Sequence, residues 1–505
     1  MDAREYLTSD ATTLAGLVAD KEVTAVELLA LARERQDAVN TLINAVVVPL
    51  TEVADARAAD PDLSGPYAGV PFLIKDLGQE YAGFPTSNGS RALAHDVAGE
   101  HALVTRRFLD AGLVIFGKTN TPEFGAKGVT EPDLFGPARN PFNLAHTPGG
   151  SSGGSGAAVA AGIVPAAGAN DGGGSVRIPA ACNGLVGLKT SRGLGPYGPQ
   201  TGEVMFGMVT QGVVSRTVRD SASLLDAIIA PDPGAGYQAE QPPTPFAELI
   251  QHAPGTLRIG YSSSSAINAN PDSEAVAAVE SAVALLTELG HQVEEVKPPH
   301  DDEALARDFL TIWFGQLHGQ VADAKRRLGA KDSDFEADTL ASAELGRAAG
   351  MVPLLRSLAN VNDYVRALTR FHETYDLFLT PTLAKPPLEV GATTTPDRLQ
   401  KAARAVAKVR GGKLLSASGI LDQLISDNIG WVPYTQLANL TGRPAISVPL
   451  HWTQQGLPLG VQLVGRLGSD GLLMQLAAQL EEARPWFHRY AELDPALDSP
   501  RRTRS

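Results

Sequence analysis

Residues 149–179 decide the fold and read GGSSGGSGAAVAAGIVPAAGANDGGGSVRIP. Two glycine-dense turns carry isolated hydroxyl groups, Ser151 in the first turn and Ser175 in the second. Glycine lets a ligand approach the main-chain N–H groups, which can stabilise a developing oxyanion. The segment between the turns is apolar and typical of a buried core, which argues against a flexible Gly/Ser linker. The stretch therefore predicts a hydrolytic site on a buried framework.

A lysine upstream supplies the base that such a site needs. It ends the run GVPFLIKD at 69–76, where apolar residues precede Lys75. A serine hydroxyl is a weak nucleophile until a base accepts its proton, and lysine must be neutral to do so. The ordinary pKa of lysine is about 10.4, so burial must lower the pKa of Lys75 by roughly 2–3 pH units if this lysine is to act as a base near neutral pH. A carboxylate of Asp76 pointing toward Lys75 would oppose this, so the direction of Asp76 is left open.

These three segments, in this order, resemble the amidase signature family of serine hydrolases. The resemblance extends from the N-terminal helices to about Arg484. It implies an enzyme that cleaves amide C–N bonds through a Ser–cisSer–Lys triad and an acyl-enzyme. Residue by residue, the match makes Ser175 the nucleophile, Ser151 the bridging serine and Lys75 the base.

The second glycine turn is expected to hold the oxyanion. The candidate N–H donors are Gly172, Gly173, Gly174 and Ser175. This turn has one more glycine than the commonest family form, and Asn170 stands where a threonine is usual, but neither change removes a catalytic atom. Asp171 and Arg177 are expected to hold the turn by an ion pair.

The bulk composition limits the class of protein. The 505 residues are 43% hydrophobic and 19% charged, which allows a large core and excludes a disordered chain. The net charge of −14 opposes binding to nucleic acid or to an anionic membrane. The single cysteine, Cys182, excludes an internal disulfide and is expected to be a small buried hydrophobe. The start lacks a secretory pattern, so we expect a cytoplasmic protein.

Short apolar runs that alternate with turns and helical stretches predict the α/β class. Strands are expected at 69–74, 113–116, 184–188, 257–261, 292–296, 376–379, 445–449 and 459–464. Thr24 and Glu27 form a capping-box pattern that opens a helix. The resemblance implies a central twisted mixed β-sheet, with helices on both faces and a helical cover region.

We expect one domain over residues 1–498. It divides into N-terminal helices (1–65), a catalytic core (about 66–230), a cover (about 300–430) and C-terminal core strands with a helix (about 431–490). Residues 499–505 are expected to form a frayed tail.

Two other motifs point to different chemistry. Residues 112–119, GLVIFGKT, fit the phosphate-loop pattern with Lys118, but the four middle positions are bulky, apolar and strand-like. Residues 150–154 fit the nucleophile-elbow pattern with Ser152, which requires a later acid and histidine such as Asp376 and His451. The contexts of Asp376 and His451 are not distinctive. A P-loop-like nucleotide-binding protein and a hydrolase with Ser152 as nucleophile are kept as the alternative interpretations.

Within the family, the sequence at 117–123, 139–141, 175–180 and 444–452 is most similar to the 6-aminohexanoate-cyclic-dimer hydrolase branch. A generalist amidase, an aryl-acylamidase or a carbamate-cleaving urethanase would have the same triad, and these alternatives stay open. Ile178 stands where the glutamine-hydrolysing amidotransferase branch commonly has glutamine. Substrate choice is expected to depend on the loops after Lys75 and on residues 130–135, 310–317 and 430–437.

Four aromatic residues are candidates for an apolar substrate pocket: Phe135, Trp313, Phe314 and Trp431. No motif implies a metal or an organic cofactor, and the expected partner is a small amide. The oligomeric state stays open, although a homodimer is common among similar proteins.

Overall fold

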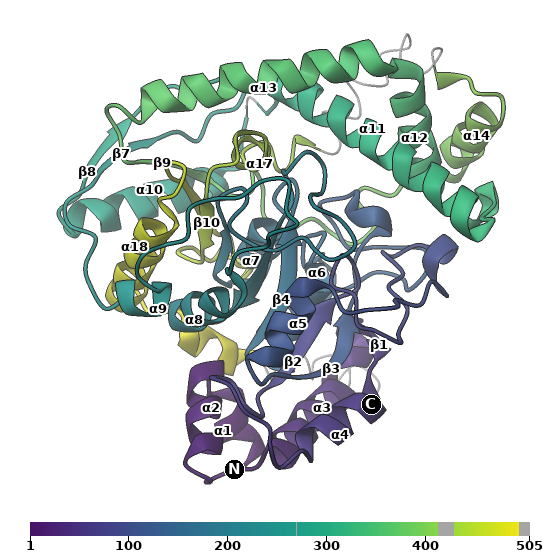
Figure 1. Cartoon of the computed structure of the whole chain (residues 1–505). Coiled ribbons are helices and arrows are strands. Elements are labelled where there is room, and N and C mark those ends of the chain that lie inside the picture. Colours follow the sequence, from purple (N-terminus) through teal and green to yellow (C-terminus); the bar gives the residue numbers. More distant parts are fainter. Residues whose placement is uncertain (269, 413–428, 494–505) are drawn as a thin grey trace, which may run out of the picture.

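The computed structural model describes residues 1–268, 270–412 and 429–493 (Figure 1). The expected tail at 499–505 lies outside these residues. The strands are β1 (Val46–Pro49), β2 (Pro71–Lys75), β3 (Val114–Thr119), β4 (Ala166–Asp171), β5 (Gly187–Lys189), β6 (Thr210–Ser215), β7 (Arg258–Tyr261), β8 (Gln292–Glu295), β9 (Leu377–Pro381), β10 (Ala445–Val448) and β11 (Val461–Val464).

These strands form one mixed sheet in two parts. The order is β1-β3-β2-β4-β6 in the first part and β5-β10-β11-β9-β7-β8 in the second. Two backbone hydrogen bonds between Val186 and Ser215, of 2.9 and 3.2 Å, join the end of β6 to the residue before β5. The predicted central mixed sheet is thereby confirmed.

All eight predicted strands are present, with ends that differ by at most three residues. The sequence reading missed β1, β4 and β6, although it identified the residues around β4 as core. Strand β4 reads AAGAND and is buried throughout. Alanine and glycine are not strand formers, so only its place between β2 and β6 makes it a strand.

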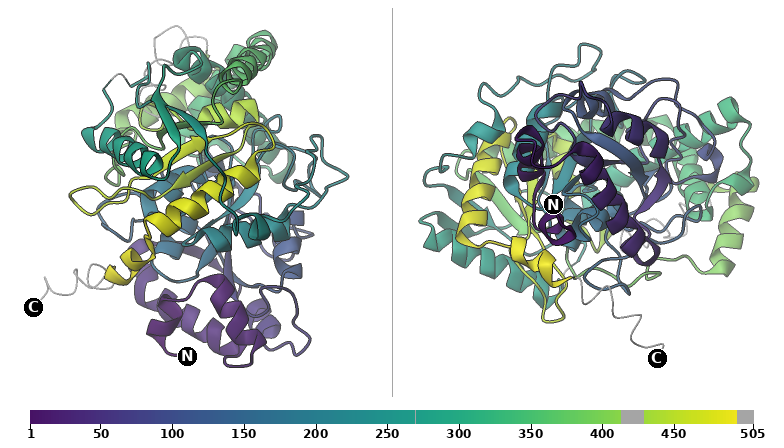
Figure 2. Two further views of the ribbon diagram at one scale, coloured as in Figure 1. Left: turned by 90° about the vertical axis from the view of Figure 1, so that its left-hand side faces the viewer. Right: turned by 90° about the horizontal axis from the view of Figure 1, so that it is seen from below.

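Helices lie on both faces of the sheet (Figures 1 and 2). They are α1 (Ala3–Leu7), α2 (Ala11–Ala19), α3 (Ala25–Ile43), α4 (Thr51–Ala58), α5 (Leu103–Asp110), α6 (Gly153–Ala160), α7 (Arg177–Asn183), α8 (Val218–Ile228), α9 (Phe246–Leu249), α10 (Ser273–Glu288), α11 (Asp302–Leu328), α12 (Ala337–Ala349), α13 (Met351–Phe371), α14 (Asp397–Lys408), α17 (Gln436–Thr441) and α18 (Asp470–Ala483). Short 3₁₀ turns are η1 (Arg91–Leu93), η2 (Glu123–Gly125), η3 (Asp332–Asp334) and η5 (Phe487–Glu492).

Local sequence sets several helix ends. Helix α3 begins after Thr24, whose hydroxyl accepts from the Glu27 N–H while the Glu27 carboxylate accepts from the Thr24 N–H. The predicted capping box is therefore confirmed. Helix α18 ends at Ala483, just before Pro485, which cannot continue a helix.

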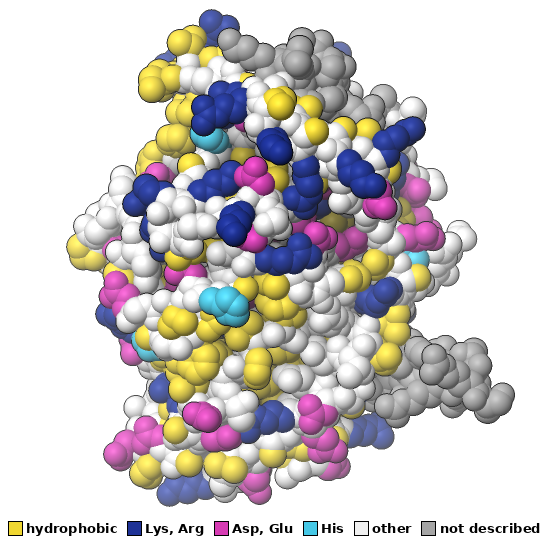
Figure 3. All heavy atoms as spheres, turned by 90° about the vertical axis from the view of Figure 1, so that its right-hand side faces the viewer, with side chains coloured by type: hydrophobic (Ala, Val, Ile, Leu, Met, Phe, Trp, Pro, Cys, Tyr) yellow, Lys and Arg dark blue, Asp and Glu magenta, His cyan; other side chains and the backbone are white. Residues whose placement is uncertain are grey.

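Helices α11 to α14 form a helical cover at the end of the molecule opposite the N-terminal helices (Figure 1). Residues 413–428 of the predicted cover range lie outside the described residues. Strand β9 returns from this region into the sheet, between β11 and β7. On the face shown in Figure 3, acidic and basic side chains both occur. In the described part of the chain, no helix is both long and apolar enough to span a bilayer.

The sheet direction positions the site. Strand β2 is parallel to β3 and to β4, and Leu73 pairs with Ala167. The carboxyl ends of parallel strands meet at one edge of a sheet, where ligands commonly bind. Lys75 ends β2 and Asp171 ends β4, so the two predicted motifs meet at this edge.

Candidate active site

Lys75 is buried at the end of β2 and contacts two polar side chains. Its Nζ lies 2.7 Å from Ser151 Oγ and 2.8 Å from Asn170 Oδ1. The main-chain N–H of Lys75 donates to Gln79 Oε1 at 2.8 Å, which fixes the strand end. The lysine and the first serine of the prediction therefore lie in direct contact.

The environment of Lys75 favours its neutral form. Burial lowers its pKa well below the ordinary value, and the negative charge of Asp171 opposes this to a smaller extent. The open question about Asp76 is answered by its contacts. Its carboxylate accepts hydrogen bonds from Ser87 and lies 3.8 Å from Lys118 Nζ, so its charge is directed to those groups.

Ser151 lies in the first glycine turn, two residues before the start of α6. The Gly150–Ser151 peptide bond is cis, as the resemblance implied. The turn is closely packed, because a Cβ at Gly150 would lie 2.7 Å from the Val129 carbonyl oxygen. Gly125 faces Ser151 from the other side, where an added Cβ would lie 3.2 Å from Ser151 Oγ.

Ser175 lies two residues before the start of α7 and lines the cavity described below. Its side chain has no hydrogen-bond partner among the described residues, and its exposed fraction is 8%. No hydrogen bond joins it to Ser151 in this structure, so the geometry shows the lysine–serine pair directly and places Ser175 beside the space for a ligand.

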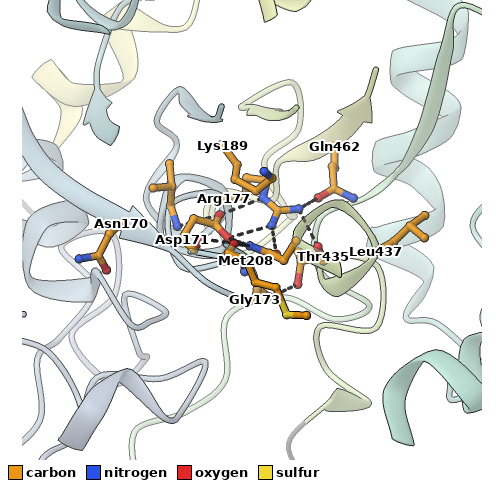
Figure 4. Close-up of polar contacts among 12 residues, drawn as sticks. Asn170, Asp171, Gly173, Arg177, Lys189, Met208, Thr435, Leu437 and Gln462 are labelled. Atoms are coloured by element: carbon orange, nitrogen blue, oxygen red, sulfur yellow. Dashed lines mark hydrogen bonds and ion pairs between the residues drawn. The ribbon is translucent and has the colours of Figure 1, made fainter. Parts of the chain in front are cut away.

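The predicted ion pair between Asp171 and Arg177 is confirmed (Figure 4). Arg177 Nε and Nη2 donate to the two carboxylate oxygens at 2.9 Å each, and both side chains are fully buried. Burial by itself raises the pKa of Asp171, but the charge and hydrogen bonds of Arg177 outweigh it and hold that pKa well below its ordinary value. Arg177 also donates to the Thr435 carbonyl and to Gln462 Oε1, which ties the turn to α17 and β11.

The expected oxyanion donors differ in their availability. The Gly174 N–H donates to Asp171 Oδ1 at 2.7 Å, so it is already used, contrary to the expectation that it faces the ligand. The N–H groups of Gly173 and Ser175 have no acceptor among the described residues. Glycine is needed here, because a Cβ at Gly173 would lie 2.7 Å from Phe309 Cζ and one at Gly174 would lie 2.5 Å from Thr435 Oγ1.

A cavity of about 830 Å³ separates the glycine turn from the cover. Trp313, Phe314 and Trp431 line it, as predicted. Phe135 does not, so that candidate is wrong: its carbonyl instead accepts a hydrogen bond from Asn44 Nδ2 at 2.9 Å. The lining includes residues of 310–317 and 430–437 but none of 130–135.

Sequence reasoning missed several cavity residues. Lys127 Nζ lies 2.7 Å from Asp338 Oδ2 and 3.8 Å from Glu336 Oε2, and all three line the cavity. Burial raises the pKa of Glu336 to about 7. Gln436 lines the cavity from the first turn of α17. No local pattern marks Lys127, Glu336 or Asp338, because Lys127 lies far in sequence from the other two. Gln436 falls within 430–437, which was expected to affect substrate choice, but it was not singled out.

The two alternative motifs form no site. Residues 114–119 are β3, and Lys118 Nζ is buried and donates to the Pro85 carbonyl and Thr86 Oγ1 at 2.6 Å each. Ser152 Oγ donates to the Asn170 carbonyl, while His451 Nε2 lies 2.7 Å from Glu274 Oε2. Neither a phosphate loop nor a Ser152–His451 pair is present.

Cys182 is buried, as expected, and burial raises its pKa well above the ordinary value. The residues that the structure describes contain no group of three or more His, Cys, Asp or Glu side chains placed to hold a metal ion.

Known proteins match this chain over nearly its full length. The family model described as Amidase matches residues 27–474. The 6-aminohexanoate-cyclic-dimer hydrolase of Pseudomonas sp. (strain NK87) is 36% identical over 502 residues, covering 96% of this chain and 97% of that protein. A putative amidase AmiC of Mycobacterium tuberculosis (strain ATCC 25618 / H37Rv) is 37% identical over 487 residues, covering 95% of this chain and 96% of that protein.

A solved structure of 6-aminohexanoate cyclic dimer hydrolase complexed with substrate superposes with a TM-score of 0.87 at 35% identity, covering 96% of this chain and 99% of that one. A bacterial aryl acylamidase superposes with a TM-score of 0.82 at 27% identity, covering 96% and 98%. Because the family model and these relatives match nearly the whole chain, the chain belongs to the amidase signature family of amide-hydrolysing enzymes.

Proposed function

We propose that this enzyme cleaves amides through a Ser175 acyl-enzyme, with Lys75 as base and Ser151 as the bridge between them. The observation that carries the proposal is the 2.7 Å contact between the buried Lys75 Nζ and Ser151 Oγ. A buried amine in its neutral form can accept a proton, and a hydroxyl beside it can pass one on.

In the first half-reaction, Ser175 Oγ attacks the amide carbon, and its proton passes through Ser151 to Lys75. The carbonyl oxygen becomes an oxyanion, which the N–H groups of Gly172, Gly173 and Ser175 stabilise. Ser151 then returns a proton to the departing amine, which leaves the acyl group on Ser175. A water molecule attacks this ester by the reverse route and releases the acid.

The unpaired Ser175 hydroxyl at the cavity supports the role of nucleophile. The buried Asp171–Arg177 pair supports a rigid turn, because it fixes both ends of the glycine segment. Preorganised donors of this kind stabilise charge without reorganising during the reaction.

For the substrate, we propose cyclic or linear amides of the 6-aminohexanoate type. Two relatives and a solved structure that bear this name, similar over nearly their full length, support the choice. The apolar part of the cavity, with Trp313, Phe314 and Trp431, suits a polymethylene chain. Three alternatives remain: aryl-acylamidase activity, generalist amidase activity and cleavage of carbamates. The similarity to an aryl acylamidase and to a putative amidase supports the first two.

A hydrolysis panel tests the proposal. It comprises a 6-aminohexanoate cyclic dimer, linear amides, an anilide, an ester and a carbamate, each with wild-type enzyme and the Ser175→Ala variant. We expect amide hydrolysis by the wild type, none by Ser175→Ala, and a mass increase of one acyl group on the peptide that contains Ser175 after rapid acid quench. Equal rates for the two proteins would exclude the proposed nucleophile.

We further propose a cytoplasmic enzyme, which the single cysteine supports. Cell fractionation tests the location, and light scattering tests whether the enzyme is a homodimer.

A further inference from the structure

Gln436 is a buried side chain whose hydrogen-bonding groups are unused. It is the first residue of α17, its exposed fraction is 3%, and it lines the cavity that Ser175 also lines. Its Oε1 is shielded from solvent and has no hydrogen-bond partner among the described residues. Its Nε2 donates to no described residue either, and it is not among the shielded, unpartnered atoms.

An unpaired buried amide is unusual enough to need an explanation, because it loses hydrogen bonds to water without replacing them. The neighbouring polar side chains are all paired. Thr435 Oγ1 donates to the Gly173 carbonyl at 2.6 Å, and Asn439 binds Asp171 through Nδ2 at 2.9 Å. Gln436 is therefore the exception in a segment whose other polar side chains serve the fold.

The position of Gln436 connects it to the reacting centre. The preceding residue, Thr435, holds the carbonyl of Gly173, two residues before Ser175. Trp431 and Val432, from the same segment, and Trp313, from α11, line the same cavity. A substrate whose scissile amide lies at Ser175 thus extends into a space that is apolar at Trp313 and Trp431 and that also contains the unpaired amide of Gln436.

We propose that Gln436 is a substrate-binding residue that hydrogen-bonds a second amide group of the substrate, away from the scissile bond. This inference rests on the proposed function and narrows it to diamides, including cyclic dimers of ω-amino acids. A glutamine amide presents both a donor and an acceptor, and a second amide offers the complementary acceptor and donor. A plain alkyl chain would leave Gln436 unpaired, so a substrate with one amide is disfavoured.

The test compares two matched pairs of linear substrates. In one pair the acyl part contains either an internal amide or a –CH₂–CH₂– unit, and in the other pair the amine part does. We expect wild-type kcat/KM to favour the diamide about tenfold or more in at least one pair, the order expected for one hydrogen bond to a buried polar group. Gln436→Met keeps the length of the side chain and removes the amide, so the preference is expected to collapse toward 1.

Gln479→Met is the matched control, because Gln479 lies on α18 and its Oε1 is 3.0 Å from His291 Nε2. It is expected to keep the wild-type preference. Thermal unfolding of the ligand-free enzyme gives a second readout. Loss of an unpaired buried amide leaves Tm unchanged or raises it, whereas loss of a structural hydrogen bond lowers it.

The proposal is overturned if the wild type hydrolyses both members of each pair equally, or if Gln436→Met keeps the preference. A lower Tm with an unchanged preference assigns Gln436 to the fold and likewise overturns it. These outcomes leave amide hydrolysis intact. If the wild type cleaves none of the four substrates and none of the amides in the earlier panel, the proposed function itself fails, and this inference fails with it.

Discussion

Asn170 Oδ1 accepts a hydrogen bond from Lys75 Nζ over 2.8 Å, while Asn170 Nδ2 donates to the Leu77 carbonyl at 2.7 Å. Because the Leu77 carbonyl binds Nδ2 of Asn170, the Asn170 Oδ1 faces the lysine, and this oxygen can only accept a hydrogen bond. An uncharged amine that donates to Asn170 keeps its lone pair for the Ser151 hydroxyl. Asn170, which stands where the family usually has threonine, thus orients the lysine that we propose as the base.

The pH dependence of activity should report Lys75. Burial lowers its pKa well below the ordinary value, so the amine is neutral above that pKa and protonated below it. Activity should therefore rise with pH through the pKa of Lys75 and stay high on its alkaline side. The measurement is kcat/KM for a good amide substrate between pH 5 and pH 10, where an acid limb centred near the pKa of a free lysine, about 10.4, would contradict the assignment.

Asn170→Asp should move this limb to higher pH. A carboxylate within hydrogen-bond distance of Nζ favours the ammonium form and raises the pKa of Lys75, by about one to three pH units for a close opposite charge. Asn170→Thr introduces no charge and restores the usual family residue, so its limb should stay near that of the wild type. Identical acid limbs for Asn170→Asp and wild type would show that Asn170 does not act on the lysine.

Lys75→Met and Ser151→Ala should each lower kcat by about a thousandfold or more, because residues that act as one catalytic unit lose most of their effect together. For the same reason, the double variant should be little worse than the more damaged single variant. Single-turnover kinetics on one amide measure all three. A double variant whose loss is the product of the two single losses would mean that the residues act independently.

Arg177→Met should destabilise the protein strongly. The change leaves the Asp171 carboxylate buried without its partner, which costs about 3–5 kcal/mol in comparable pairs. The control is Arg326→Met, which breaks an exposed pair with Asp323 and should change stability by only about 0.5 kcal/mol. Urea unfolding measures both, and equal midpoints for the two variants would contradict the structural role of Arg177.

Gly173→Ala should slow catalysis by about ten- to a hundredfold, since a displacement of about 1 Å at a reacting group has effects of this size. The added Cβ would lie 2.7 Å from Phe309 Cζ, and the turn that carries Ser175 would shift. Adding Phe309→Leu removes that contact and should recover part of the rate. Gly319→Ala in α11, where a Cβ meets nothing within 4 Å, should leave kcat unchanged.

The sequence predicted the central sheet, its helices and the contact between Lys75 and Ser151. The individual strands depend on short-range patterns, because an apolar run bounded by turn residues forms a strand. The central mixed sheet and the Lys75–Ser151 contact were expected from the family resemblance, because they join segments far apart in the chain. The interpretation of 112–119 as strand was also confirmed, since its bulky apolar residues pack in the core. Strand β4 was missed, because its small residues have no strand preference of their own.

The sequence by itself determined which residues can carry the chemistry, because a lysine, two serines and glycines without side chains are required in that order along the chain. Only the tertiary structure decided which partner each polar group meets. The Asp76 side chain points toward Lys118, the Asn170 side chain toward Lys75, and the backbone N–H of Gly174 toward Asp171. The tertiary structure also showed that Gln436 lines the cavity and that Phe135 does not. The physical reason is that a cavity between a sheet and its cover is lined by segments far apart in sequence, whose packing no local pattern records.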